Sequence, residues 1–265
     1  MVNLYIWLIK INLYHKTKQM KQIKVLLIGC IVAQSLSVQS LCAQVKEGMV
    51  TYEEKVDAHR RIPKEDEQMK AMIPQFRTNK YELLFADNKS LYKAAEEEPD
   101  LSEQPQGGGG MIMRFGGAEN VFYKDFTTQT AVEKRELMEK EFIVEDSIRN
   151  MNWKLIDGET KTIAGHVCKK ATGKSERGFD LVAWYADDIP LSSGPGQFSG
   201  LPGLILVLDV NEGEFVYTAT DIQNKVNKSD IKAPSQGKKV TPAEFAKIRK
   251  ELFGDDNGPM RIIRN

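Results

Sequence analysis

Residues 199–210 read SGLPGLILVLDV, and this stretch decides the fold. Its second half is apolar except for one aspartate and does not alternate, which is typical of a strand buried on both faces. Its first half places Pro202 and Gly203 at the central positions of a tetrapeptide, as in a type II turn, where the second central residue needs a positive φ. The stretch predicts a tight turn, built on Gly200, Pro202 and Gly203, that leads into a central strand.

Short runs of β-branched, aromatic and alternating residues fill most of the chain after residue 46. Strands are expected at 47–57, 79–87, 89–97, 140–148, 204–210 and 215–223, with another within 120–137 and three within 152–190. Turn residues separate several of them, notably at Asp87-Asn88 and at Asn211–Gly213.

Only two segments predict helices. Residues 62–74 carry an apolar stripe made of Met69, Met72 and Ile73. Residues 241–252 begin with a capping box, in which Thr241 and Glu244 satisfy each other's backbone amides. Strands do not alternate with long helices, which argues against a doubly wound α/β fold. We expect a mainly β (α+β) protein: one antiparallel sheet, curved or half-closed into a barrel, with the two short helices on one face.

The N-terminal region has the layout of an export signal. Residues 20–43 contain a basic start, a short apolar run and small residues at the end, as secretory signal peptides do. The apolar run is shorter than the ~20 residues that span a membrane. Residues 1–19 are then an extension, or a sign that translation starts at Met20. A second interpretation makes Cys30 a lipidated cysteine, because it follows Leu-Ile-Gly.

The remaining chain is expected to form a single domain over 44–254, with a flexible acidic and glycine-rich loop at 96–110 and a tail at 255–265. This domain would keep Cys168 as its one cysteine, so an ordinary hydrophobic core has to stabilise it. The 37 basic and 37 acidic residues of the 265-residue chain cancel, which argues against a nucleic-acid partner.

A resemblance to a known family rests on the stretch SGPGQFSGLPGLILVLDV together with IAGHVCKKA and VAWYADDIP upstream. The chain is similar in these blocks to the GLPGLI family of secreted bacterial proteins. The resemblance implies an exported, largely β envelope protein found with outer-membrane uptake systems, and it supplies no catalytic residues. The upstream blocks are also similar to periplasmic lipoprotein-carrier domains, which are half-barrels.

The leading functional hypothesis is a non-enzymatic binding or accessory module of the periplasm or outer membrane. Its curved sheet would present a groove to a lipidic, peptide or protein ligand. The expected groove residues are Trp184, Tyr185, Phe198, Leu201 and Pro202.

Two alternatives stay open. The first is periplasmic copper or zinc handling by soft ligands, namely Met111, Met113, His166 and Cys168. The second is a hydrolase that uses the acids at Asp187 and Asp188. No serine stands in a G-x-S-x-G motif, the glycine-rich segment does not match a phosphate-binding loop, and no cofactor is predicted.

Overall fold

The computed structural model describes residues 44–95 and 120–253. These residues belong to one unit, which begins at Gln44. The expected signal peptide, Cys30, the loop at 96–110, Met111, Met113 and the tail at 255–265 all lie outside the described residues.

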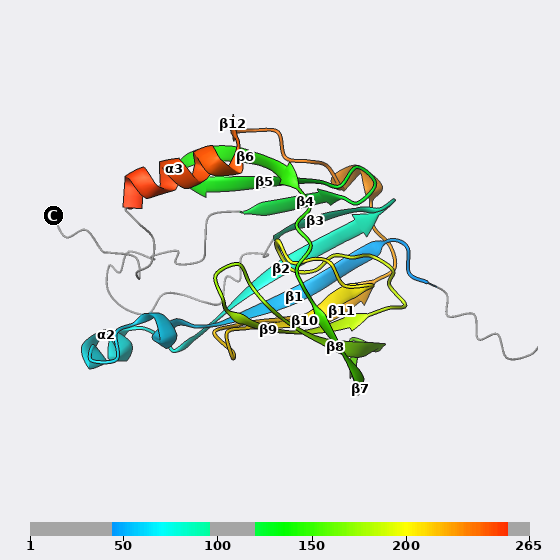
Figure 1. Ribbon diagram of the computed structural model, residues 1–265, viewed down its shortest axis with the longest axis horizontal. Coiled ribbons are helices and arrows are strands. Elements are labelled where there is room, and N and C mark those ends of the chain that lie inside the picture. The colour runs from blue at the N-terminus through cyan, green and yellow to red at the C-terminus, as the bar shows by residue number, and fades with distance from the viewer. Residues whose placement is uncertain (1–43, 96–119, 254–265) are drawn as a thin grey trace, which may run out of the picture. The chain divides into compact units, whose positions relative to one another are not determined.

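The described strands form a single open sheet of twelve strands (Figure 1). Its order is β12-β6-β5-β4-β3-β2-β1-β11-β10-β9-β8-β7, and every neighbouring pair is antiparallel except β12 with β6. The strands are β1 (Gly48–Asp57), β2 (Phe76–Ala86), β3 (Lys89–Ala94), β4 (Val121–Asp125), β5 (Thr130–Leu137), β6 (Lys140–Ser147), β7 (Lys154–Ile163), β8 (His166–Lys174), β9 (Asp180–Ala186), β10 (Leu204–Val210), β11 (Phe215–Gln223) and β12 (Lys238–Val240). The mainly β, single-sheet prediction is confirmed.

The central position of β10 is also confirmed. It lies between β9 and β11, and five of its seven residues are buried. A bulge interrupts its pairing with β9 between Ile205 and Val207. The Tyr52 hydroxyl of β1 donates to the Ile205 carbonyl at 2.6 Å, so this interruption leaves no orphaned carbonyl there.

Both faces of the sheet are buried around β2. Leu83 and Phe85 belong to the main hydrophobic cluster, which also contains Leu204 and Leu206 of β10. Leu84 between them points to the opposite face, because successive side chains of a strand alternate. A separate cluster on that face includes Leu84, Ala86, Leu91, Tyr123, Val132, Ile143 and, from the connection between β11 and β12, Ile231.

The segment 187–203, between β9 and β10, is irregular but well buried. Phe198 and Leu201 pack in a cluster with Tyr185 and Ile205. Its backbone carbonyls accept from the start of β10: the Leu204 amide donates to the Ile189 carbonyl at 3.1 Å, and the Ile205 amide donates to the Ser193 carbonyl at 2.9 Å. The 187–203 segment therefore forms part of the core rather than a free loop.

The prediction of a type II turn at Leu201–Leu204 is wrong. Gly200 has a positive φ of 102°, whereas Gly203, the residue that the turn requires to have a positive φ, does not have one. Gly203 is needed for space instead, because a Cβ there would lie 2.1 Å from the Ala186 carbonyl oxygen. The glycine lets β10 begin directly against the end of β9.

The other turns follow the sequence more closely. Asp87 and Asn88 have φ values of 51° and 59° and join β2 to β3. Asn211, Glu212 and Gly213 also have positive φ and join β10 to β11. The segment 120–137 holds two strands rather than one, since β4 and β5 form a hairpin.

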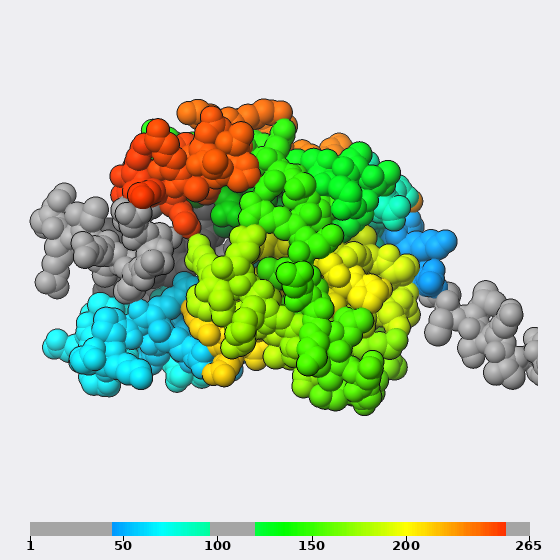
Figure 2. Space-filling model, in the orientation of Figure 1, coloured from blue at the N-terminus to red at the C-terminus, as the bar shows by residue number. Residues whose placement is uncertain are grey.

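The helices fit the prediction only in part. The helix α3 (Pro242–Phe253) has the expected capping box, with the Thr241 amide donating to Glu244 at 2.7 Å. It packs on β6 through the Phe142 and Phe245 rings, and Figure 2 shows its orange and red residues against the green ones. None of the described helices is long and apolar enough to cross a membrane.

The first helix is shorter than expected. After η1 (Ala58–Arg61), α2 covers only Glu67–Met72 and buries no residue. Met72 is 82% exposed, so the predicted apolar stripe does not pack on the sheet. Helix α2 therefore does not share a covered face of the sheet with α3, contrary to expectation.

The two roles of glycine predict different losses of stability. Replacing Gly203 by alanine forces a Cβ into a backbone carbonyl and should lower the free energy of unfolding by about 3 kcal/mol or more. Replacing Gly213 by alanine meets no atom within 4 Å and adds only the strain of its positive φ, about 1–2 kcal/mol. Denaturant unfolding measures both, and equal losses would contradict this assignment.

Candidate functional site

The residues expected to line a groove do not form one. Tyr185, Phe198 and Leu201 are only 3%, 9% and 1% exposed, because the 187–203 segment is packed on the sheet. Trp184 is half-buried, with the Lys170 ammonium 5.8 Å from its ring centre, and Pro202 is exposed. The prediction fails because the 187–203 segment itself packs on the face of the sheet where a ligand was expected.

Side chains from distant strands fix this segment in place. Lys124 of β4 donates to the Phe198 carbonyl at 2.9 Å, and the Ser90 and Ser193 hydroxyls lie 3.1 Å apart. On the other side, Ser199 donates to the Arg149 carbonyl and accepts, through its own carbonyl, from the Trp153 indole, both at 2.9 Å. These bonds occupy polar groups that a ligand would otherwise use.

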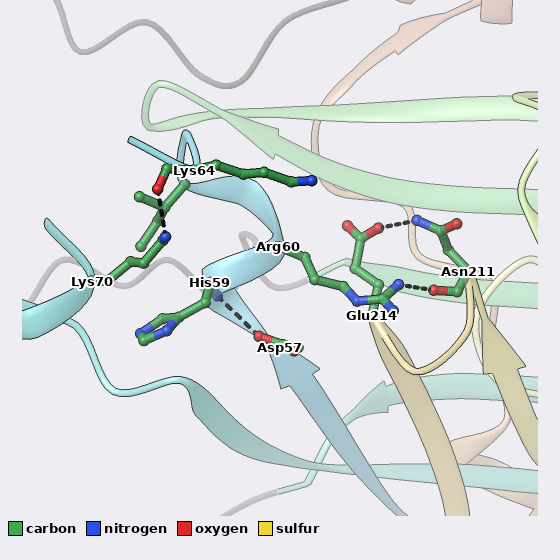
Figure 3. A pocket seen from close by; sticks show the side chains of 8 residues that line it. Asp57, His59, Arg60, Lys64, Lys70, Asn211 and Glu214 are labelled. Atoms are coloured by element: carbon green, nitrogen blue, oxygen red, sulfur yellow. Dashed lines mark hydrogen bonds between the residues drawn. The ribbon is translucent and has the colours of Figure 1, made fainter. Parts of the chain in front are cut away.

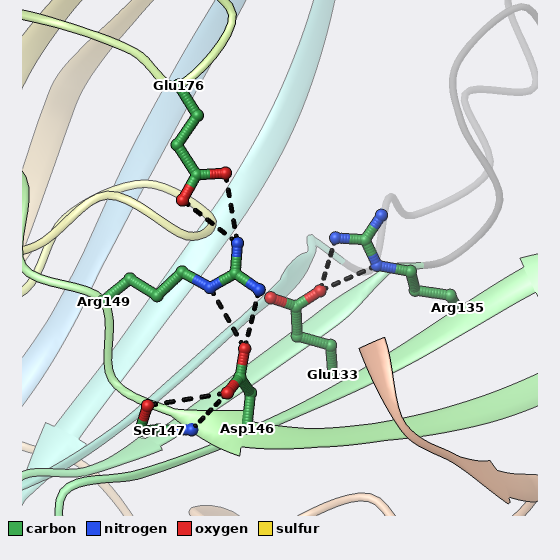
Figure 4. Close-up of polar contacts among 6 residues, drawn as sticks. All are labelled: Glu133, Arg135, Asp146, Ser147, Arg149 and Glu176. Atoms are coloured by element: carbon green, nitrogen blue, oxygen red, sulfur yellow. Dashed lines mark hydrogen bonds and ion pairs between the residues drawn. The ribbon is translucent and has the colours of Figure 1, made fainter. Parts of the chain in front are cut away.

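The segment after β6 is held by ion pairs. The Arg149 guanidinium lies between the carboxylates of Asp146 and Glu176, at 2.7 and 3.1 Å (Figure 4). Arg135 pairs separately with Glu133 on β5. Because Arg149 also presents its carbonyl to Ser199, these contacts stabilise the anchor of the 187–203 segment.

Among the residues that hold the 187–203 segment, Lys124 has a strongly shifted pKa. Its side chain is buried, and burial lowers its pKa to about 7, although the charge of Glu133 acts in the opposite direction. Because this amine releases its proton at lower pH in the folded protein than in the unfolded chain, it makes folding stability depend on pH.

His166 and Cys168 of β8 lie close together, and Asp188 acts on both. His166 Nδ1 lies 2.7 Å from the Asp188 carboxylate, and Asp187 pairs with Lys169. Cys168 is fully buried, and burial together with the charges of Asp188 and Asp187 raises its pKa to about 12. The thiol is therefore protonated at neutral pH, which does not favour metal binding.

No group of three or more His, Cys, Asp or Glu residues in the described ranges is placed to hold a metal ion. Met111 and Met113 lie outside these ranges. The metal hypothesis stays a prediction.

An open pocket of about 520 Å³ lies where β1 leads into η1 and the β10–β11 hairpin ends (Figure 3). Three of its lining residues are cationic at neutral pH and two are anionic. The lining residues are Asp57, His59, Arg60, Ile62, Lys64, Lys70, Asn211 and Glu214. In Figure 3, Arg60 and Lys64 extend in the same direction, toward the hairpin.

Both pocket carboxylates are already engaged by the protein. Asp57 accepts from the His59 amide at 3.1 Å and from the Gln75 amide group at 3.3 Å. Glu214 pairs with Arg61 at 3.1 Å and accepts from the Asn211 side chain. The charge of Glu214 is thus partly neutralised by Arg61, which does not line the pocket, whereas Asp57 accepts from neutral groups.

The cationic groups are less constrained. Arg60 donates to the Asn211 carbonyl, and Lys70 contacts Glu67 and the Lys64 carbonyl, both at 2.8 Å. Lys64 forms no ion pair with another described residue. The remaining N–H donors of Arg60 and Lys64 suit a carboxylate or phosphate group.

Sequence reasoning missed this pocket. Its residues come from 57–70 and 211–214, which no local pattern brings together. The pairing of β1 with β11, in which Val56 lies opposite Phe215, creates the proximity. The basic residues of 59–70 were the one available signal.

Comparisons with known proteins agree with the β fold. Residues 173–207 match a family model described as "Protein of unknown function (Porph_ging)". Two crystal structures of PNGF-II, in space groups P21 and C2, are similar to the chain with TM-scores of 0.51 and 0.52 at 13% identity. They cover 77% of this chain, which spans about a third of theirs (33% and 32%). No curated protein matches the chain.

The buried lysine predicts a measurable pH dependence. Between pH 7 and 9 the unfolded chain keeps the Lys124 proton that the folded protein has released, so folding stability should rise with pH. The rise is at most about 1.4 kcal/mol per pH unit, and Lys124→Met should remove it. Chemical unfolding at several pH values measures the effect.

Lys174→Met is the matched control, because this lysine side chain is 68% exposed. The control should keep the rise of the wild-type protein. If the free energy of unfolding of the wild-type protein stays constant or falls between pH 7 and 9, the pKa of Lys124 is not lowered by burial.

Proposed function

We propose that the protein is an exported cell-envelope binding module of the GLPGLI type, without an enzymatic role, that serves outer-membrane uptake. The hexapeptide GLPGLI at 200–205 lies inside the stretch that matches the Porph_ging family model. The signal-type N-terminus and the open antiparallel sheet are consistent with this proposal.

The open pocket is the ligand site in this proposal. The observation that carries it is the combination of free cationic donors on Arg60 and Lys64 with carboxylates that the protein itself engages. The ligand class is a molecule that presents a carboxylate or phosphate group, from an acidic peptide or from a lipid headgroup. Asn211 and Glu214 on the opposite wall add a polar group and a carboxylate, whose charge the ion pair with Arg61 partly neutralises.

Calorimetric titration of the protein tests this site. The probes are a hexaglutamate peptide, a hexaglutamine peptide as the neutral comparison, and vesicles with and without phosphatidylglycerol. We expect hexaglutamate or the anionic vesicles, but not the neutral probes, to bind. The affinity should fall as salt is added, because these charges are exposed.

A pair of double variants isolates the pocket. Arg60→Gln with Lys64→Gln should weaken binding at least about tenfold, or about 1.4 kcal/mol. Lys225→Gln with Lys232→Gln removes the same charge from exposed positions between β11 and β12 and should leave affinity unchanged. Equal losses in the two double variants, or no binding of any acidic probe, would refute the proposal.

A further inference from the structure

A second polar cluster lies on the sheet away from the pocket, around Glu54 of β1. The Glu54 side chain accepts from the Asn79 amide group at 2.8 Å. Tyr217 of β11 lies directly opposite Glu54, and Tyr81 of β2 lies two residues along the strand from Asn79, which is opposite Glu54 on the other side. The Glu54 charge raises the pKa of both tyrosines, after burial itself. The residue is only 8% exposed, yet it forms no ion pair with another described residue. Buried carboxylates normally have a cationic partner, so this one is incomplete.

Tyr92 of β3 gives an independent sign of an incomplete site. The residue is 4% exposed, and its hydroxyl is buried without a hydrogen-bond partner among the residues that the structure describes. The hydroxyl lies close enough to Tyr217 and Glu54 for their charges, after burial itself, to raise its pKa. Since buried polar groups are nearly always hydrogen-bonded, the unsatisfied hydroxyl points to a missing partner within this cluster.

Aromatic rings enclose the same region. Tyr81 stacks on Tyr92 with ring centres 5.0 Å apart, and Phe122 meets Tyr92 edge-on at 6.2 Å. Asn79 and Tyr81 are half-buried and form the outer rim. The cluster thus combines a carboxylate, tyrosine hydroxyls and ring faces, which all attract a positive charge.

We propose that the cluster of Glu54, Tyr81, Tyr92 and Tyr217 binds a primary ammonium group. An ammonium carries three donors and no acceptor, which matches the Glu54 carboxylate and the oxygens of Tyr92 and Tyr217. A quaternary ammonium would satisfy the rings but not these oxygens. The carrier of the ammonium is a small amine or the side chain of a lysine. This site is separate from the pocket at Arg60 and Lys64 and does not depend on the function proposed for it.

Titration of the protein with n-butylammonium chloride tests the site, followed by NMR or calorimetry. We expect saturable binding, weaker binding of tetramethylammonium, and no competition by n-butanol. Glu54→Gln should raise the dissociation constant at least about tenfold, because it removes a charge-assisted contact. Tyr92→Phe should also raise it about tenfold, because it removes a hydrogen bond from a charged donor.

The control is Tyr123→Phe, which also removes one tyrosine hydroxyl. Tyr123 follows Phe122 in β4, so its side chain lies on the opposite face of the sheet from the cluster. It should leave the affinity unchanged. Near-UV circular dichroism establishes that each variant is folded, and if Glu54→Gln does not fold, Tyr92→Phe alone decides. No saturable binding of n-butylammonium, or the same affinity in Tyr92→Phe as in Tyr123→Phe, would overturn the proposal.

Discussion

The structure depends on packing an irregular segment, 187–203, into the core of a sheet. Burying Ile189, Leu191, Phe198 and Leu201 contributes about 1.5–3 kcal/mol for each side chain. The contact requires that Gly203 lack a side chain next to the Ala186 carbonyl. It also requires partners for the segment's backbone, which Lys124 and Trp153 supply to the Phe198 and Ser199 carbonyls. Without such partners, the free-energy penalty of burying the loop's polar backbone would exceed the stabilisation from its apolar contacts.

This packing determines where a ligand has access. The middle of the sheet is closed, because the apolar and polar groups there contact the segment. The pocket beside Arg60 and Lys64 stays open where β1 ends and β11 begins. The tyrosines around Glu54 are part of the sheet's packed interior, but their polar groups are incompletely paired among the described residues. The two places differ in charge, since one offers cationic donors and the other a carboxylate. Both proposed sites would therefore take ligands that carry charged groups rather than purely apolar ones.

Much of the fold could be predicted from local patterns. Alternation located most of the strands, the unbroken apolar run of 204–210 identified the central strand, and Thr241 with Glu244 identified the start of α3. These features depend on residues close together in the chain. The role of Gly203 was misassigned because its steric neighbour, Ala186, is remote in sequence and becomes adjacent only through the register of β9 with β10.

The candidate sites were harder to predict for the same reason. Tyr185 and Leu201 looked suited to a groove, since aromatic and apolar residues near glycines serve equally for binding and for packing. Glu54, Tyr81 and Tyr217 come together only because β1 pairs with β2 on one side and β11 on the other. No spacing within the sequence indicates that contact.

Native-state hydrogen exchange of the Leu204 and Ile205 amides tests the central claim most directly. If the 187–203 segment is part of the cooperative core, these amides, bonded to the Ile189 and Ser193 carbonyls, should exchange as slowly as those of Leu83 and Phe85 in β2. Exchange many times faster than in β2 would show that the segment opens on its own. The claim that the 187–203 segment is packed into the core would then be wrong.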